Sequence, residues 1–586
     1  MVIYVYKKEE CILKYNLIGS NDTSNIIKTV LSNRGITQWE EYINLRQAPR
    51  NTYNDLNNIT EAIDLFDKHF QAQHPIAILV DNDVDGISSA TVMYKFIKAI
   101  DDFYDVRMYV HQRNKSHGLD GDFIIDEDVK LLIVPDAGSN DVEQHKELYN
   151  KGIDCLCLDH HHVTADITDS PAIIVNNHNS NEYKNKGCCG ASITMEFCRA
   201  LEEYYWEDIC DQFVDLVGVA NVCDIMPLTE FETRATVNEG LMCLNNKMLK
   251  TIVDAQEFSM KGIVSPHTVG FYVGPLINSF IRMATFEERQ LLVRAFCEDE
   301  SETFWYTKRG EDFPTEENIY EHVVRLMKSY KGKQDRLKKK ALPELIKNVN
   351  GKDNKVAVIN ATGILDSSLT GVTAIKVSEE LNLPVLLLQE RDEDNYGGSG
   401  RAFDNCPVKD FRALIEECPY TDMAQGHNSA FGVSIPKQNI ELVQNWLNDK
   451  LEDVSMQKIY EVDFEIDADE LEAYMFQVLD ENKTLWGHGV SEPLFAIQDL
   501  HISSENARVC GKNHDTIQIY DGMTDIKYVM FFCKADNELL NWINNNWGDQ
   551  QADITIIGTL GLSLYEGRLD RQVVIKDFKI TNTIQN

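Results

Sequence analysis

The chain has 586 residues, of which 43% are hydrophobic, and a formal net charge of −38 at pH 7. This length is too great for one hydrophobic core and predicts three or four domains, and no segment approaches the length of a membrane span. The 94 acidic residues against 56 basic ones exclude a uniformly basic surface, so any nucleic acid must lie in a local basic groove.

Residues 1–75 predict a mixed, largely helical segment that packs on the domain that follows. The chain begins with apolar residues ahead of its first lysines and lacks the apolar core of a signal peptide, so we expect a cytoplasmic protein of a bacterium, or of a host cell if the gene is viral. The fourteen cysteines follow no regular framework. They are predicted to be reduced core thiols and not disulfides or a zinc site.

Residues 76–86 are the most informative segment. The apolar run Ile76–Val80 predicts a buried strand, and it is followed by Asp81, Asp83 and Asp85. Three carboxylates on alternate positions repel one another in a drying site, so we expect divalent metal between them. Gly86 permits a tight turn into a helix whose N-terminal dipole favours phosphate.

Three further apolar runs end in potential ligands. They are Leu131–Val134 before Asp136, Cys155–Leu158 before Asp159 to His162, and the helical run 213–222 before Asp224. Ligands of an open parallel sheet lie beyond the carboxyl ends of its strands, so these side chains are expected to converge. Oxygen and imidazole donors favour manganese or magnesium over zinc.

The remaining pattern predicts an α/β protein with several domains. Alternating strands and helices over 76–285 predict a mostly parallel sheet covered on both faces. Residues 286–345 are charged and helically spaced, which predicts a long helical connector. Strand and helix patterns resume over 346–452 as a smaller α/β domain, and 453–586 form a β-rich tail typical of an OB-type barrel.

The acidic and histidine motifs, in this order, resemble motifs one to four of the DHH phosphoesterases and, more narrowly, those of the RecJ exonucleases specific for single-stranded DNA. Other RecJ-like segments are Arg113 with 117–119, 274–278 with Arg282, 398–401 and 426–432 of the DHH-associated domain, and 486–495 at the start of the OB fold.

The chain departs from the family pattern at four positions. His117 replaces a Tyr, Leu276 an Arg, Ile281 a Gly and Gln425 a Gly. None is an expected metal ligand, so the departures concern substrate contacts and polarity.

The resemblance implies a 5′-to-3′ exonuclease that degrades single-stranded DNA by two-metal hydrolysis in DNA repair, recombination or replication. Two divalent cations, Mn²⁺ in preference or Mg²⁺, are implied, with Asp136 as the bridge. Asp159 would orient His160 or its neighbour, and His161 would face the scissile phosphate. The implied metal ligands are Asp81, Asp83, Asp85, Asp136, His160 and Asp224, and the implied substrate-binding residues are Arg113, Arg282, Ser399, Arg401 and His427.

Two other functions remain open. A DHH phosphodiesterase acting on short oligonucleotides or cyclic dinucleotides would share the metal motifs but usually lacks the barrel. An inactive replication scaffold would be expected to have lost ligands, and none is lost here. The net charge also makes a partner that presents the strand, a single-strand-binding protein or helicase, an expected companion, and the lysine-rich run 331–340 a candidate DNA path.

Overall fold

The structure is a computed structural model that describes residues 13–45, 51–113, 116–120, 122–349, 354–545, 550–565 and 567–584. The first twelve residues of the predicted N-terminal segment lie outside this description. Two compact units are present, each built from separate stretches of the chain. Unit 1 contains the described residues up to Trp39, Leu337–Lys483 and those from Glu492 on, and unit 2 contains Glu40–Arg336 and Thr484–Ser491. Within the described residues, no helix is long and apolar enough to cross a membrane.

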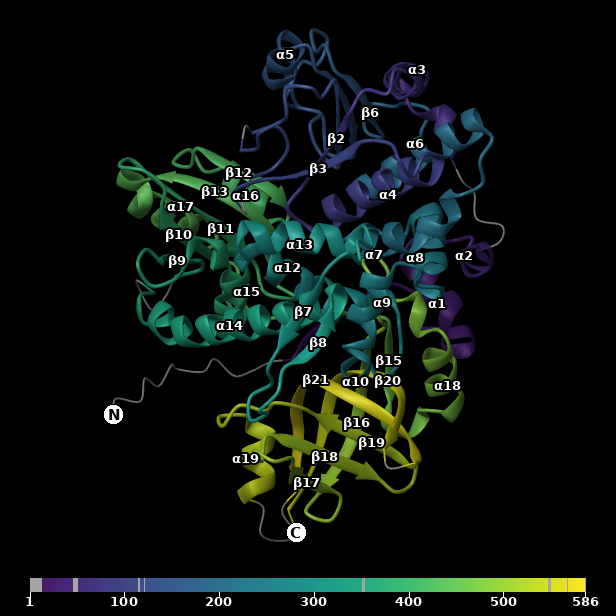
Figure 1. The fold of residues 1–586 in the computed structure, drawn as a ribbon. Helices are drawn as coiled ribbons and strands as arrows, with labels where there is room; N and C mark the ends of the chain where they lie inside the picture. The colour runs from purple at the N-terminus through teal and green to yellow at the C-terminus, as the bar shows by residue number, and fades with distance from the viewer. Residues whose placement is uncertain are drawn as a thin grey trace. The chain divides into compact units, whose positions relative to one another are not determined.

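A five-stranded, fully parallel sheet forms the centre of unit 2, as the sequence predicted (Figure 1). Its strands lie in the order β3-β2-β4-β5-β6. The chain thus starts in the interior of the sheet at β2, adds β3 on one side, and then adds β4, β5 and β6 in turn on the other side. Three of the five strands, β2, β4 and β5, carry buried apolar runs, because a sheet covered on both faces has no solvent side. The strands are β2 (Ile76–Val80), β3 (Val106–Val110), β4 (Leu131–Pro135), β5 (Asp154–Asp159) and β6 (Ile173–Asn176).

Helices cover both faces of this sheet. Helices α4 (Val84–Ile100) and α6 (Gly190–Tyr205) contact each other, and they pack on β2 and β5. Helix α5 (Val142–Asn150) covers the other face, where Leu148 joins a core with alternate residues of β4 and β5. The loops that follow β2, β4 and β5 therefore meet at one edge of the sheet.

The rest of unit 2 is mainly helical. Helix α7 (Val214–Cys223) is apolar on almost every side and buried over most of its length, so it runs through the core and not across the surface. The region expected as a purely helical connector also contains an antiparallel hairpin, β7 (Thr303–Tyr306) and β8 (Thr315–Asn318). The other helices are α2 (Trp39–Ile43), which begins at the unit boundary, α3 (Ile59–Gln71), α8 (Phe231–Met242), α9 (Lys247–Asp254), α10 (Glu257–Met260), α11 (Pro266–Thr268), α12 (Gly274–Met283) and α13 (Phe286–Phe296).

Unit 1 joins the two ends of the chain. Strand β1 (Lys14–Leu17) pairs in parallel with β14 (Ile459–Val462). A five-stranded mixed sheet follows α14 (Ile319–Lys347) and has the order β12-β13-β11-β10-β9. Its elements are β9 (Ala357–Asn360), α15 (Thr370–Leu381), β10 (Val385–Glu390), β11 (Asn395–Arg401), α16 (Phe411–Glu416), β12 (Met423–His427), β13 (Ala430–Pro436) and α17 (Ile440–Lys450), while α1 (Ile26–Asn33) lies near the N-terminus.

The C-terminal part of unit 1 is rich in β-structure, as predicted. Seven strands lie in the order β15-β16-β20-β21-β19-β18-β17. The long β20–β21 pair changes register at two points, which bends the sheet. The elements are β15 (Phe464–Asp467), α18 (Ala473–Glu481), β16 (Phe495–Ser503), β17 (Ala507–Cys510), β18 (Thr516–Asp521), β19 (Ile526–Met530), α19 (Glu538–Asn545), β20 (Gln551–Tyr565) and β21 (Arg568–Ile584).

Candidate active site

Three carboxylates surround the start of helix α4. Asp81 follows β2 directly, and Asp83 is the N-cap of α4, where its side chain accepts a hydrogen bond of 2.9 Å from the Gly86 N–H. A Cβ at Gly86 would lie 2.5 Å from the Asp81 Cβ, so only glycine lets the helix begin this close to the strand end. Asp85 is buried in the first helical turn.

Asp85 ties α4 to the N-terminus of α6. Its two carboxylate oxygens accept hydrogen bonds from the Gly190 and Ala191 N–H groups, at 2.7 and 2.9 Å. A negative charge at a helix N-terminus is favoured by the unpaired N–H groups and the helix dipole. The Asp85 side chain therefore holds the N-termini of α4 and α6 together beside the candidate site.

Asp136 follows β4 and is almost fully buried. Its backbone has φ = 65°, a left-handed conformation that Asp adopts more readily than most residues. A Cβ at Gly190 would lie 2.5 Å from its Oδ1. The start of α6 is thus packed directly against the Asp136 carboxylate.

The two histidines that follow β5 have different surroundings. His160 is buried, with Nε2 at 3.2 Å from the Asp136 Oδ1, 3.5 Å from Asp224 and 3.7 Å from Asp85. His161 is about half exposed, and its Nδ1 lies 2.8 Å from the Asp159 Oδ1. The same oxygen also accepts hydrogen bonds from the N–H groups of both histidines.

Every expected metal ligand is brought into one region of unit 2. Asp81, Asp83 and Asp136 offer oxygens within 4.8 Å of one another, and the same holds for donors of Asp85, His160 and Asp224. Asp224 reaches this place as the C-cap of α7. A third group contains Asp136, His160 and His161. Asp136 and His160 each belong to two of these groups.

Burial and mutual repulsion set the protonation of the carboxylates. Burial, with the charges of Asp81 and Asp85, raises the pKa of Asp83 to about 6. Burial and the charges of Asp85 and Asp83 raise the pKa of Asp224 to about 8. The pKa of Asp136 lies well above its usual range for the same two reasons.

The histidines differ in charge. Burial lowers the pKa of His160 despite its acidic neighbours, so its imidazole is neutral, the form that binds metal. Burial opposes protonation of His161, but the hydrogen bond and charge of Asp159 raise its pKa. Although burial favours the neutral acid, His161 and His160 hold the pKa of Asp159 well below its usual range. Asp159 at the end of β5 is therefore an anion, and of the two histidines that follow it His161 is protonated more readily than His160.

The donor set fits hard divalent cations. Asp136 Oδ1 is buried and accepts no hydrogen bond within the described residues, which is costly unless a cation satisfies it. Five carboxylates and one neutral imidazole match the oxygen-rich ligands of Mn²⁺ and Mg²⁺. Two such ions would cancel most of the charge that raises these pKa values.

Sequence reasoning missed two residues at this site. His117, noted only as a departure from the family pattern, places Nδ1 2.7 Å from Asp81 Oδ2, and this hydrogen bond raises its pKa to about 9. Arg289, buried on α13, donates to the Gln112 carbonyl at 2.6 Å and approaches Asn82 Oδ1 at 3.4 Å. The contact partners of both residues are far away in the sequence, so no local motif could identify them.

The two expected basic residues of unit 2 lie in different settings. Arg282 is partly buried on α12 and close enough to Asp83 for that charge to act on it. Arg113 is 69% exposed and pairs with Asp122, its Nε lying 3.2 Å from Oδ1. Asn82 ties the Arg113 loop to the strand end through the Arg113 carbonyl at 3.1 Å.

The expected substrate residues of unit 1 gather at one end of the mixed sheet. Ser399 and Arg401 lie on β11, and a Cβ at Gly371 would meet the Arg401 guanidinium at 2.8 Å and the Ser399 hydroxyl at 3.4 Å. Gly371 belongs to the first turn of α15. His427, at the end of β12, and Arg401 both pair with Ala430 in β13. The arrangement combines a helix N-terminus, a guanidinium and a hydroxyl, which together suit an anion.

Two family models match the chain. The N-terminal domain of the DHH family matches residues 75–220, and the RecJ OB domain matches residues 462–577. These spans contain the parallel sheet with most of the acidic residues described above, and the seven-stranded sheet of unit 1.

Curated proteins and solved structures resemble the chain over nearly its whole length. A putative SPbeta prophage-derived single-strand DNA-specific exonuclease, YorK, of Bacillus subtilis is 36% identical and covers 98% of this chain and 99% of the relative. The single-stranded-DNA-specific exonuclease RecJ of the same organism is 21% identical, covering 95% of this chain and 68% of the relative. The crystal structure of RecJ with Mn²⁺ from Thermus thermophilus has a similar fold, with a TM-score of 0.71, 18% identity and coverage of 94% and 76%.

Proposed function

Because the chain belongs to the RecJ-like group of the DHH family, we propose that it is a metal-dependent exonuclease that hydrolyses single-stranded DNA from its 5′ end. The observation that carries the proposal is the convergence of all six family-type ligands on one region beyond the strand ends. DNA repair, recombination or replication are the processes that such an activity would serve.

The residues that would hold two divalent cations are Asp81, Asp83, Asp85, Asp136, His160 and Asp224, with Asp136 between the ions. Bound there, the cations supply Lewis acidity, which lowers the pKa of a water molecule and offsets the charge of the scissile phosphate. His160 contributes a neutral nitrogen, and Asp85 keeps the helix start in place. His117 orients Asp81 through its 2.7 Å contact.

His161 is the proposed contact to the scissile phosphate. Asp159 binds its Nδ1 and favours the protonated ring, so Nε2 can donate a hydrogen bond to a phosphate oxygen. Asp159 acts through His161 and is therefore a positioning residue. The other carboxylate oxygen of Asp159 accepts a hydrogen bond of 2.9 Å from the Ser139 N–H, which links this histidine to the loop that carries Asp136.

We assign recognition of the 5′ end of the DNA to unit 1. Ser399, Arg401 and the first turn of α15 form the proposed pocket for a terminal 5′-phosphate, because a guanidinium and helix N–H groups match phosphate geometry. His427 lies at the same sheet end and would reach the substrate from there. Arg113 and Arg282 would contact the strand near the metal ligands.

The net charge shapes the proposed partners. A chain with a charge of −38 gains little from long-range attraction to a phosphate backbone. The basic residues of α14 form a local cluster of positive charge that could attract DNA, although Lys331 is already paired with Asp335 at 2.8 Å. We therefore propose that a single-strand-binding protein or a helicase is a partner that delivers the DNA strand.

The test uses purified full-length protein with Mn²⁺ and 3′-labelled single strands ending in a 5′-phosphate or a 5′-hydroxyl. RNA, duplex, dinucleotide and cyclic dinucleotide serve as comparison substrates. Wild-type protein should shorten the DNA strand stepwise from its 5′ end, and Asp136→Asn should not. Arg401→Ala should lose the preference for the phosphorylated end, whereas Arg391→Ala, an exposed arginine of the same unit, should keep it.

Other outcomes would redirect the assignment. Turnover of dinucleotides or cyclic dinucleotides alone would favour a small-substrate phosphodiesterase. Failure to cleave any substrate, with Mn²⁺ bound in wild type and lost in Asp136→Asn, would favour a scaffold.

A further inference from the structure

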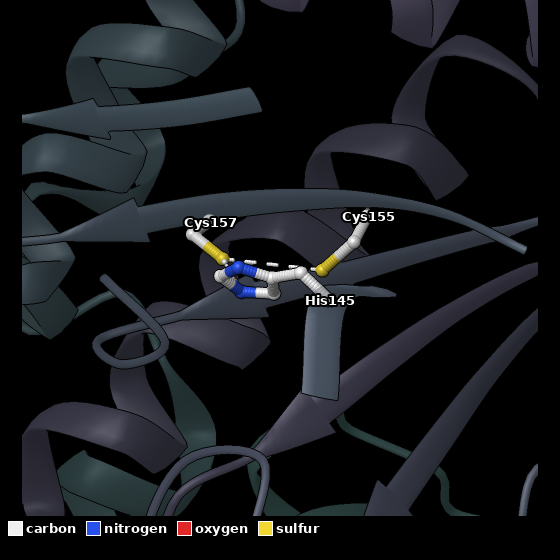
Figure 2. Close-up of side chains that lie close together, drawn as sticks. All are labelled: His145, Cys155 and Cys157. Carbon is white, nitrogen blue, oxygen red and sulfur yellow. Dashed lines mark hydrogen bonds between the residues drawn. The ribbon is translucent and has the colours of Figure 1, made fainter. Parts of the chain in front are cut away.

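A second group of side chains with potential metal donors lies on the opposite face of the parallel sheet from α4 and α6. Cys155 and Cys157 occupy alternate positions of β5, so both thiols point to the face covered by α5. His145 of α5 lies against them, with Nε2 3.4 Å from the Cys157 sulfur (Figure 2). The two sulfurs are 3.9 Å apart, and all three side chains are buried.

We propose that His145, Cys155 and Cys157 bind a thiophilic d¹⁰ cation, with Zn²⁺ as the expected ion, separately from the oxygen-rich site. Zn–S bonds of about 2.3 Å and Zn–N bonds of about 2.0 Å in a tetrahedron place two sulfurs about 3.8 Å apart and a sulfur and a nitrogen about 3.5 Å apart. The two distances that involve Cys157, 3.9 and 3.4 Å, match these values, and all three donor atoms lie within 4.8 Å of one another. A tetrahedral ion held by these three donors would have one further coordination position.

The hydrogen bond at Nδ1 leaves Nε2 of His145 available as a ligand. Its Nδ1 lies 2.9 Å from the Ser170 hydroxyl, whose oxygen also receives the Ala172 N–H at 3.2 Å. When that oxygen accepts both bonds, the proton of the ring is on Nδ1 and the lone pair of Nε2 faces the thiols. An outer hydrogen bond of this kind is the usual support of a metal-binding histidine.

Charge also favours a divalent ion here. As the ion binds, the S–H protons of the two thiols leave to solvent and two S–Zn bonds form, so two thiolates and one neutral imidazole leave no net charge in the core. Asp141 and Asp159 lie close enough to Cys157 for their charges to act on it. Hard Mn²⁺ and Mg²⁺ prefer the carboxylates of the other site, so the two sites select different ions.

An ion in this place would support the loop that carries Asp136. A Cβ at Gly138 would lie 2.7 Å from the Cys157 sulfur, so the loop rests directly on this side chain. The sequence alone predicted reduced core thiols and no zinc site here. It could not show that α5 brings a third donor to the pair.

The experiment uses the full-length protein, freed of metal by chelation and kept in excess Mg²⁺ to occupy the oxygen-rich site. Titration with Co²⁺, which reports its ligands optically, should give one equivalent with thiolate-to-metal charge-transfer absorption, and Zn²⁺ should displace it. X-ray absorption of the Zn²⁺ form should find two sulfurs at about 2.3 Å and nitrogen or oxygen at about 2.0 Å. This measurement needs no variant.

Variants give a graded check. Cys157→Ser and His145→Gln should weaken Co²⁺ binding by more than about 100-fold, and Ser170→Ala by about 10- to 100-fold, the usual cost of losing a partner of a ligand. Cys198→Ser, a buried thiol of α6 outside the group, and Asp224→Asn should keep the signal. If the Cys157 variant does not fold, the wild-type spectra decide. Absence of charge-transfer absorption, or X-ray absorption with only nitrogen and oxygen neighbours, would overturn the proposal.

Discussion

Asp224 offers a direct test of the electrostatics of the metal-free protein. Its carboxyl has a pKa of about 8 when folded against an ordinary value of 3.8, because of burial and the nearby charges of Asp85 and Asp83. Between these values the folded state holds a proton that the unfolded state has released. The free energy of unfolding must therefore fall as pH rises from about 4 to about 8. For one proton the slope is about 1.4 kcal/mol per pH unit.

Asp224→Asn removes this proton uptake. From pH 5 to pH 7 the wild-type protein should lose up to about 3 kcal/mol that the variant keeps. This is an upper value, because Asp83 titrates in the same range, with a pKa of about 6. At about 2 °C per kcal/mol for a large domain, this corresponds to a difference of about 6 °C in Tm.

The assay is thermal unfolding of both proteins with a chelator, at constant ionic strength, across this pH range. Asp169→Asn removes an exposed carboxylate of the same unit and should follow the wild-type curve, which controls for the general effect of net charge. Parallel curves for wild type and Asp224→Asn would refute the reasoning, because they would mean that Asp224 is ionised in the folded protein throughout.

Three further results are expected. Saturating Mn²⁺ should raise Tm more at pH 8 than at pH 6, because at the lower pH the ion must displace protons from Asp83 and Asp224; equal gains would contradict the raised pKa values. Asp136→Asn should lower kcat on single-stranded DNA by about 100-fold or more. The Tm of the metal-free variant should equal that of the wild type, since Asn tolerates the left-handed backbone. A normal rate would show that Asp136 has no role in catalysis. Gly190→Ala should lower the free energy of unfolding in urea by about 1 to 3 kcal/mol and reduce kcat, because its Cβ would collide with Asp136, whereas Gly332→Ala on α14 should not lower it. Equal stabilities of the Gly190 variant and the wild type would show that α6 can shift away from Asp136 at no cost.

Much of the fold could be predicted from sequence because the parallel strands are buried on both faces. Runs such as Ile76–Val80 and Leu131–Val134 have no polar alternation, and a carboxylate follows each of them. The β7–β8 hairpin could not be predicted in this way. Strand β8 is Thr-Glu-Glu-Asn and mostly exposed, so it has neither the apolar content nor the alternation that marks a strand.

The functional residues can be separated in the same way into those that the sequence predicts and those that it does not. The acidic side chains of the site lie at or close to the ends of strands or a helix, so their position in the chain predicts their position in space. His117, Arg289 and His145 act on residues that are 10 or more positions away, through a loop and two helices. A single sequence carries no record of such pairings, so geometry was needed to find them.

The pairing of β1 with β14 has a consequence for how the protein is made. Leu17 lies opposite Val462, so 445 residues (17 to 462) must be translated after the first strand before its partner exists. At an elongation rate of about 5 to 20 residues per second, that wait is about 20 to 90 s. Unit 2 also waits, because the Leu228 N–H bonds the His488 carbonyl, which is made later still. A ribosome that stops early therefore releases a chain in which neither unit can be completed, however intact its acidic residues are.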